Sequence, residues 1–300
     1  MRKSLQNKLM QEVNLLRELD HPNIVQYFDH FIDQENKKVY VVMEYCEGGD
    51  LASVISFTLY YIWVVLCLWF VEIPPVLTCL LIPKAFFLPE KFILQVLEQL
   101  TSALKYCHRR PDGSVVLYQD IKPANVFVAN DFNVKIGDFG LGDILPSRND
   151  YVNTQTGTLH YMCPEKLNKT FYHEKSDIWS LGCLIYELCA LKPPFAGGGK
   201  CLINRINRGK FKKIPPHYSD ELNSLIGDML QVLDFLRPSM EDILHSSLLT
   251  QQKQRTGDAA HHLPAPMTAA DLRLREPQDI PSKSWKRRLE AEHHQPSKQR

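Results

Sequence analysis

The sequence lacks an excess of charge of either sign, because 35 Lys and Arg residues balance 34 Asp and Glu residues in a chain of 300. A balanced chain gives no electrostatic reason to expect nucleic acid or an acidic membrane as a partner. The eight cysteines contain no CxxC pair and no cluster at zinc-ligand spacing. The first residues lack the apolar core of a secretory signal peptide. We therefore expect reduced thiols and no nucleic-acid partner.

What the sequence does contain is typical of a globular protein, with 44% apolar and 23% charged residues. Leucine and valine recur at helical spacing over residues 4–19, and a proline ends this pattern. Two strand-like runs follow, at residues 24–32 and 39–43. The front of the chain is therefore predicted to be a helix and about two strands.

The back of the chain is predicted to be mainly helical. Pro89 opens a strongly amphipathic helix, and short strands follow at residues 126–128 and 134–136. From residue 175 the pattern is helical. Residues 249–300 are rich in Gln, Lys, Arg, His and Pro, and such a segment buries too little apolar surface to offset its ordering entropy. We expect an α+β fold followed by a disordered polar tail.

Four residues between positions 120 and 138 have the chemistry that phosphoryl transfer from ATP requires. Asp120 can orient an attacking hydroxyl and accept its proton, and Lys122 can place a positive charge near the moving phosphate. Asn125 and Asp138 offer an amide and a carboxylate oxygen, which are ligand types that Mg²⁺ prefers. Each residue alone could equally well be an ordinary loop residue. The four together, in this order, predict a site for ATP and Mg²⁺.

This set resembles the catalytic loop and the metal-binding loop of protein kinases, in which Phe139 and Gly140 complete the Asp138 motif. Residues 163–165 are similar to the kinase Ala-Pro-Glu segment, and residues 175–182 to the buried helix of the large lobe. The resemblance implies a bilobal kinase-like fold.

The resemblance also assigns structural roles to three buried charges. It implies that Asp177 holds the backbone of the catalytic loop and that Arg237 pairs with Glu165. For these residues we favour a scaffold role over a catalytic one.

The domain boundaries follow from the same resemblance. We expect a kinase domain over residues 1–248, divided into a partial small lobe (1–45) and a large lobe (46–248). An apolar insert at residues 57–87 interrupts the large lobe, and the tail covers residues 249–300.

Residues 44–50 resemble the hinge between the two lobes. The resemblance implies that the backbone of Glu44 and Cys46 binds adenine, that Met43 is the gatekeeping side chain, and that Phe127 packs beneath the ring. The alternative is an ordinary turn between a strand and a helix.

Lys122 and Thr158 are typical of serine/threonine kinases, where the threonine bonds the catalytic Asp and Lys. Residues 12–19, 21–25 and 179–190 are similar to NIMA-related kinases. The resemblance implies protein substrates with Ser or Thr acceptors, a cell-cycle role, and a location in the cytoplasm, centrosome or nucleus. Oligomeric state is not indicated.

The chain departs from the family at its start. Glu12 occupies the position of the kinase helix glutamate, and the eleven residues before it hold no GxGxxG motif and no strand lysine. We therefore expect this 300-residue chain to bind ATP weakly. The alternative to an enzyme is a pseudokinase that binds partner proteins.

A second departure lies beside the catalytic aspartate, where Gln119 replaces the arginine usual in the family. A neutral amide lacks the charge that pairs with a phosphate on the activation segment. Thr154 and Thr156 are candidate phosphorylation sites, and we expect their phosphorylation to couple poorly to activity.

The third departure is the uncharged run at residues 57–71, followed by a second apolar run to residue 82. The first run is short for a membrane span. A re-entrant membrane hairpin over residues 57–82, a surface insert prone to aggregation, and translated non-coding sequence remain alternatives. We expect no membrane association.

Overall fold

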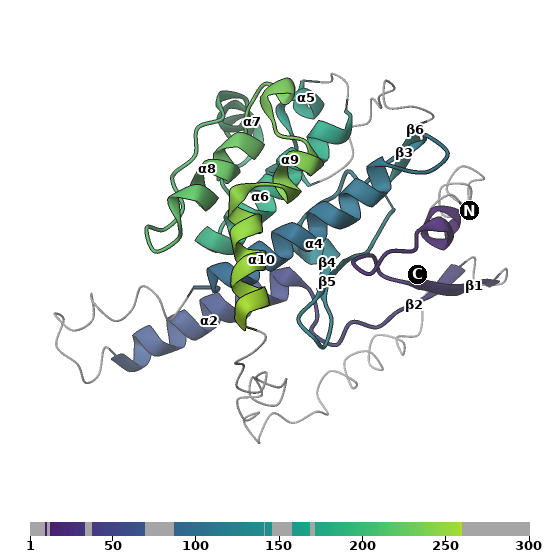
Figure 1. The fold of residues 1–300 in the computed structure, drawn as a ribbon, viewed down its shortest axis with the longest axis horizontal. Coiled ribbons are helices and arrows are strands. Elements are labelled where there is room, and N and C mark those ends of the chain that lie inside the picture. Colours follow the sequence, from purple (N-terminus) through teal and green to yellow (C-terminus); the bar gives the residue numbers. More distant parts are fainter. Residues whose placement is uncertain are drawn as a thin grey trace, which may run out of the picture. The chain divides into compact units, whose positions relative to one another are not determined.

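The computed structural model describes residues 10, 13–33, 38–69, 87–140, 142–145, 158–168 and 172–259. Figure 1 shows the hairpin of residues 27–43 at the right and most of the helices toward the left, in agreement with the predicted α+β organisation. Within the described ranges, the strands form three separate two-stranded sheets.

The first part of the chain consists of a helical segment at residues 13–18 and a hairpin of β1 (Tyr27–Asp33) and β2 (Lys38–Met43). The strands are antiparallel, and Phe31 faces Tyr40 with their rings stacked 4.8 Å apart. The predicted runs are confirmed as strands, but β1 lies a few residues later than expected. The reason is that residues 23–25 bond to β5 instead, through Val25 N–H to Ile136 O at 2.8 Å.

A long helix, α2 (Leu51–Trp69), runs through the start of the predicted insert. The sequence predicts only a short helix near Leu51. The helix continues because no Gly or Pro interrupts residues 51–69. Leu51 and Ile55 are buried, whereas the side chains of Phe57, Tyr60 and Trp63 are 59%, 63% and 62% exposed.

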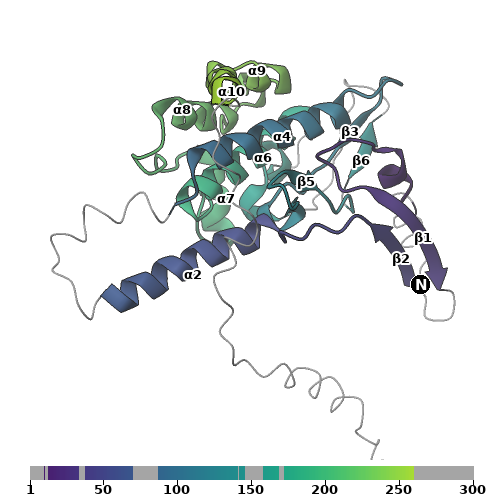
Figure 2. The ribbon, with the colours of Figure 1, turned by 60° about the horizontal axis from the view of Figure 1, so that its bottom comes forward.

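Figure 2 shows this part of α2 extending away from the other helices. No helix in the described ranges has the length and apolar character needed to cross a bilayer. The rest of the predicted insert, residues 70–86, lies outside the described residues.

The core of the back half is formed by α4 (Glu90–His108) and α6 (Glu174–Ala190), which pack against each other. Pro89 is the N-cap of α4, as predicted. In α6, Trp179 is fully buried and its ring stacks on Phe195 at 5.4 Å. These two helices form the base on which the loops of the candidate site rest.

Two small sheets frame these loops. The predicted strands are confirmed as β4 (Val126–Val128) and β5 (Val134–Ile136), which pair with each other. A second pair, β3 (Val115–Leu117) and β6 (Asp143–Leu145), was not predicted. A three-residue strand leaves no periodic pattern, so only its pairing reveals it.

The remaining helices lie on either side of α6 in the sequence and complete the core. They are the short α5 (Pro164–Leu167) before it, then α7 (Gly199–Arg208), α8 (Asp220–Met229), α9 (Met240–Leu244) and α10 (Ser247–Ala259). Three 3-10 turns complete the described elements: η1 (Pro123–Asn125), η2 (Leu159–Tyr161) and η3 (Asp234–Leu236).

Helix α10 corrects the start of the predicted tail, because residues 249–259 are helical. Leu249 is fully buried, Gln252 Nε2 donates to Lys91 O at 3.2 Å, and Lys253 pairs with Glu98 at 2.8 Å. The polar composition of residues 249–259 did not predict these contacts between α10 and α4. Residues 260–300 lie outside the described residues.

Candidate active site

The catalytic loop places three predicted residues within hydrogen-bonding distance of one another. The carboxylate of Asp120 is buried, with 8% of the residue exposed. It accepts from Lys122 Nζ at 2.6 Å and from Asn125 Nδ2 at 2.9 Å, both at Oδ2. The turn η1 makes this possible, because it folds residues 123–125 back over Asp120, and Asn125 Nδ2 also bonds Asp120 O at 3.0 Å.

Thr158 joins this group from a distant part of the chain. Its hydroxyl lies 3.4 Å from Asp120 Oδ1 and 3.3 Å from Lys122 Nζ. The carboxylate thus meets an ammonium, an amide and a hydroxyl. Such a network fixes the orientation of a group that must accept a proton.

Asp138 lies on the strand β5 side of the loop, in an exposed position with a positive φ of 57°. Its Oδ1 accepts from Gly140 N–H at 3.3 Å. Phe139 is buried edge-on against Tyr118, with ring centroids 4.9 Å apart. This packing turns Asp138 outward, because consecutive side chains point in different directions.

Tyr118 connects the catalytic loop to the residue before Asp138 through a hydrogen bond of its hydroxyl. Burial raises the pKa of its hydroxyl well above the usual value, and the charges of Asp138 and Asp120 raise it further. The hydroxyl therefore stays protonated and donates to Gly137 O. The convergence of Asp120 and Asp138 on one region stays a prediction.

The donor set fits a magnesium ion. The amide nitrogen of Asn125 faces Asp120, so Oδ1 is the atom that can face a metal. An amide oxygen and the carboxylate of Asp138 are hard ligands, and Mg²⁺ in nucleotide sites uses one or two carboxylates together with phosphates and water. The assignment of Asn125 and Asp138 as metal ligands stays a prediction.

The residues predicted to bind adenine lie along the hinge and β4. Glu44 follows Met43 at the end of β2, and its carboxylate pairs with Lys135 of β5 at 2.9 Å. The Cys46 carbonyl accepts from Gly49 N–H at 3.3 Å. The hinge segment lies close to β4, since Gly48 N–H donates to Val128 O at 2.9 Å.

Phe127 lies on β4, opposite Asp50 of the hinge segment. A Cβ placed on Gly137 would lie 2.6 Å from its ring, so this glycine lets Phe127 pack beside the Asp138 motif. The hinge segment and Phe127 are therefore neighbours, as adenine binding requires. Their roles stay predictions.

Asp177 of α6 holds the catalytic loop by its backbone. Its carboxylate accepts from Tyr118 N–H at 3.0 Å and from Gln119 N–H at 2.9 Å. His108 Nε2 lies 2.9 Å away, and the Tyr172 hydroxyl also donates to it. Burial alone would raise the pKa of Asp177, yet its hydrogen bonds and His108 lower it.

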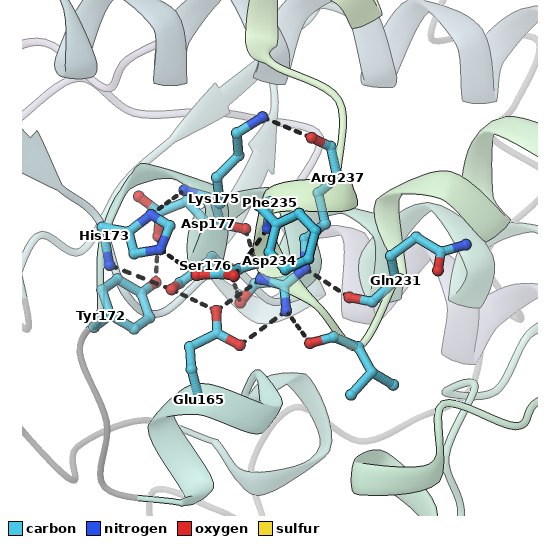
Figure 3. Close-up of polar contacts among 12 residues, drawn as sticks. Glu165, Tyr172, His173, Lys175, Ser176, Asp177, Gln231, Asp234, Phe235 and Arg237 are labelled. Atoms are coloured by element: carbon cyan, nitrogen blue, oxygen red, sulfur yellow. Dashed lines mark hydrogen bonds and ion pairs between the residues drawn. The ribbon is translucent and has the colours of Figure 1, made fainter.

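Glu165 and Arg237 form a second buried ion pair, and Figure 3 shows the two side chains facing each other. The contacts are bidentate, with Nη1 to Oε1 at 2.7 Å and Nη2 to Oε2 at 2.8 Å. Ser176 Oγ also donates to Glu165 at 2.7 Å. Burial would raise the pKa of Glu165, but Arg237 outweighs it and the pKa is lowered.

Acid should weaken the fold because of these two carboxyls. Their pKa values in the folded chain lie below those of the unfolded chain, which are about 3.9 for Asp and about 4.3 for Glu. Their stabilisation is therefore complete above those values and is lost as pH falls through the lowered ones. We expect Glu165→Gln to reduce the loss of melting temperature between pH 6 and pH 3. The matched variant Asp131→Asn, at an exposed turn, should keep the original slope; equal slopes for both would contradict the assignment.

Gln119 lies at positive φ, 68°, between Tyr118 and Asp120. Its Oε1 accepts from Lys166 Nζ at 2.9 Å. Lys166 is only 3% exposed, and its ammonium lies 4.4 Å from the centre of the Tyr172 ring. A positive charge is therefore present beside position 119, although residue 119 itself is neutral.

This contact changes what an arginine at position 119 should do. Gln119→Arg removes the acceptor for Lys166 and sets a second cation beside it, so we expect a loss of about 1–3 kcal/mol in the free energy of unfolding. Adding Lys166→Gln should restore most of that loss, because one cation and one amide are present again. Chemical denaturation of the wild type, both single variants and the double variant measures the coupling. Additive losses would show that the two side chains do not interact.

The sequence did not reveal every residue that supports the site. His108 and Tyr172 hold Asp177, and Lys166 holds Gln119, yet none was predicted. His108 did carry a signal, since it continues the apolar stripe of α4 at a position four residues after Leu104. Of the predicted residues, Glu12, Thr154 and Thr156 lie outside the described residues.

A carboxylate held by Lys, Asn and Thr, and a loop fixed by a buried Asp, together define the large lobe of a protein kinase. The family model for the protein kinase domain matches residues 1–249, and the chain belongs to the protein kinase family.

Its relatives are NIMA-related serine/threonine kinases, as the sequence predicts. The chain is 51% identical to the serine/threonine-protein kinase Nek2 of Homo sapiens over 243 residues, which cover 80% of this chain and 49% of that protein. It is 37% identical to human Nek5, over 79% of this chain and 30% of that protein. It is 32% identical to the G2-specific protein kinase nimA of Emericella nidulans, over 81% of this chain and 35% of that protein. The chain spans half or less of the length of these three relatives.

Proposed function

We propose that this site transfers the γ-phosphate of ATP to a serine or threonine hydroxyl of a protein. The observation that carries the proposal is the buried Asp120 carboxylate, which meets Lys122, Asn125 and Thr158 at once. Asp120 orients the acceptor hydroxyl and takes its proton. Lys122, held 2.6 Å away, neutralises charge on the transferring group.

Asn125 and Asp138 would hold a magnesium ion, which would neutralise charge on the phosphates and align them. The hinge around Glu44 and Cys46 positions the adenine, and Met43 limits the depth of that pocket. By analogy with a relative named G2-specific, we propose a cell-cycle role. The proposed location is the cytoplasm, the centrosome or the nucleus.

The 300 residues contain no GxGxxG motif, so we propose that a polypeptide of these residues alone binds ATP weakly. With a dissociation constant of about 1 mM, 1 mM Mg-ATP stabilises by only about 0.4 kcal/mol, a melting shift of about 1–2 °C. Differential scanning fluorimetry over a series of Mg-ATP concentrations measures this. A dose-dependent shift well beyond that size would contradict it.

The same residues joined to a complete small lobe provide the test of the proposed function. We expect that fusion to phosphorylate a generic Ser/Thr protein such as casein, and to lose this activity when Asp120 is replaced. Absence of activity in the intact fusion would overturn the proposal.

A second function, binding of partner proteins without phosphoryl transfer, is favoured by one observation. Gln119 stands where the activating arginine is expected, and it is already bonded to Lys166. In that case the fusion would fold and bind Mg-ATP, yet transfer no phosphate. The assay above separates the two.

A further inference from the structure

A groove of about 450 Å³ lies away from the candidate active site, between the end of α7 and the segment 230–236. Arg208 and Phe211 line one side, and Leu230, Leu233 and Leu236 line the other. Leu233 and Leu236 are each 53% exposed, and the neighbouring Phe235 is 72% exposed. Large apolar side chains at this exposure mark binding surfaces when they lie together.

Other parts of the fold hold both walls of the groove in place. Gly209, at φ 60°, brings the end of α7 so close to the other wall that a Cβ there would lie 2.5 Å from Val232. Buried Arg237 holds that wall from behind, through Nε to Gln231 O at 2.8 Å and Nη2 to Val232 O at 3.3 Å. Its shape is therefore fixed before any partner arrives, which lowers the entropy cost of binding.

The segment that carries Arg208 and Phe211 to the groove is strongly basic. Residues 199–213 contain six cations and no Asp or Glu, and all six cationic side chains are exposed: Lys200, Arg205, Arg208, Lys210, Lys212 and Lys213. None of the six forms an ion pair within the described part of the chain. On the opposite wall, the carboxylate of Asp234 is 2.6 Å from His173 and so is already engaged. The nearest other acid in the sequence is Asp228 of α8, two residues before Leu230.

We propose that this groove is a docking site for a protein segment that combines acidic residues with large apolar side chains. The apolar side chains enter between Phe211 and Leu236, and the acidic residues meet the cations after Arg208. Charge complementarity selects this occupant, because the six cations of residues 199–213, with no acid among them, steer and hold an acidic segment. The chain's own residues 260–300 are a poor match, since they carry more Lys and Arg than Asp and Glu.

A displayed library of random 12-residue peptides, selected on the full 300-residue chain, tests the proposal without requiring phosphoryl transfer. Parallel selections use a charge variant (Arg208→Glu with Lys210→Glu), an apolar variant (Leu233→Ala with Leu236→Ala) and a control. The control is Phe31→Ala with Lys91→Glu, which changes an exposed aromatic and an exposed cation elsewhere. Melting curves check that each variant folds.

We expect peptides selected by the wild type to be rich in Asp or Glu and in Leu, Ile or Phe. Their affinity, measured by fluorescence anisotropy, should fall at least tenfold in both groove variants and stay unchanged in the control. It should also fall as salt rises from 50 to 200 mM. Any of three results would overturn the proposal: no selected peptides above background, selected peptides that are not acidic, or equal affinity for the groove variants. A change in sedimentation of the groove variants instead of peptide binding would assign the groove to a second copy, and would also overturn it.

Discussion

Replacing Asp120 by asparagine should reduce the phosphoryl-transfer rate by about 10²–10⁴-fold in the fusion with a complete small lobe. The loss has two sources. An amide cannot accept the proton of the attacking hydroxyl, and its NH₂ group would face Lys122 and Asn125, which both donate to Oδ2 in the structure. The turnover number is the quantity to measure, with Mg-ATP and protein substrate both saturating.

The matched control for this experiment is Asp131→Asn, in the exposed turn between β4 and β5. Asp131 accepts a hydrogen bond within its own turn, from Asn133 N–H at 3.1 Å. Its substitution should leave turnover within about twofold of the wild type. If Asp120→Asn were equally mild while the protein stayed folded, Asp120 would not be the proton acceptor.

Removal of Arg237 should have the largest effect on stability. Arg237→Ala leaves Glu165 as a buried carboxylate without its bidentate partner, and it frees the carbonyls of Gln231 and Lys175 that Arg237 now bonds. Breaking a buried pair from one side costs about 3–5 kcal/mol, because the remaining charge is uncompensated. Denaturant unfolding monitored by far-UV circular dichroism measures this loss.

Removing both charges distinguishes a lost ion pair from a lost volume. The double variant Arg237→Met with Glu165→Leu keeps apolar bulk and leaves no orphan charge, so it should be much less destabilised than Arg237→Ala. The exposed pair Lys253 and Glu98 is the control, since its removal should cost at most about 1 kcal/mol. Equal losses for the single and double variants would show that packing, not charge, dominates at this position.

The contact between the residues that we propose to react could be predicted from the sequence, because their chemistry restricts residue type and spacing. A proton acceptor, a cation and two oxygen ligands seldom fall within nineteen positions by chance, and the structure places Asp120, Lys122 and Asn125 in mutual contact. Residues whose side chains hydrogen-bond to backbone N–H groups were predicted only through the family resemblance. Asp177 binds two N–H groups that any sequence would provide, so no local pattern reveals it.

The sequence alone could not predict contacts between residues that lie far apart in the chain. Lys166 and Gln119 are separated by 47 positions, and only the packing of α5 against the catalytic loop brings them together. The extent of α2 was missed for a different reason. An uninterrupted apolar run has no period, so it cannot be assigned to helix or strand before its neighbours are known. Helix α10 was missed because a few anchors to α4 outweigh a polar composition.

The apolar surface of α2 has a consequence for the protein in the cell. Phe57, Tyr60 and Trp63 present aromatic rings to water even when the chain is correctly folded. Chaperones and proteases continuously select chains according to how much apolar surface they expose. Chaperones and proteases should therefore treat this folded chain as they treat an incompletely folded one. Its abundance should depend on quality control as much as on its rate of synthesis.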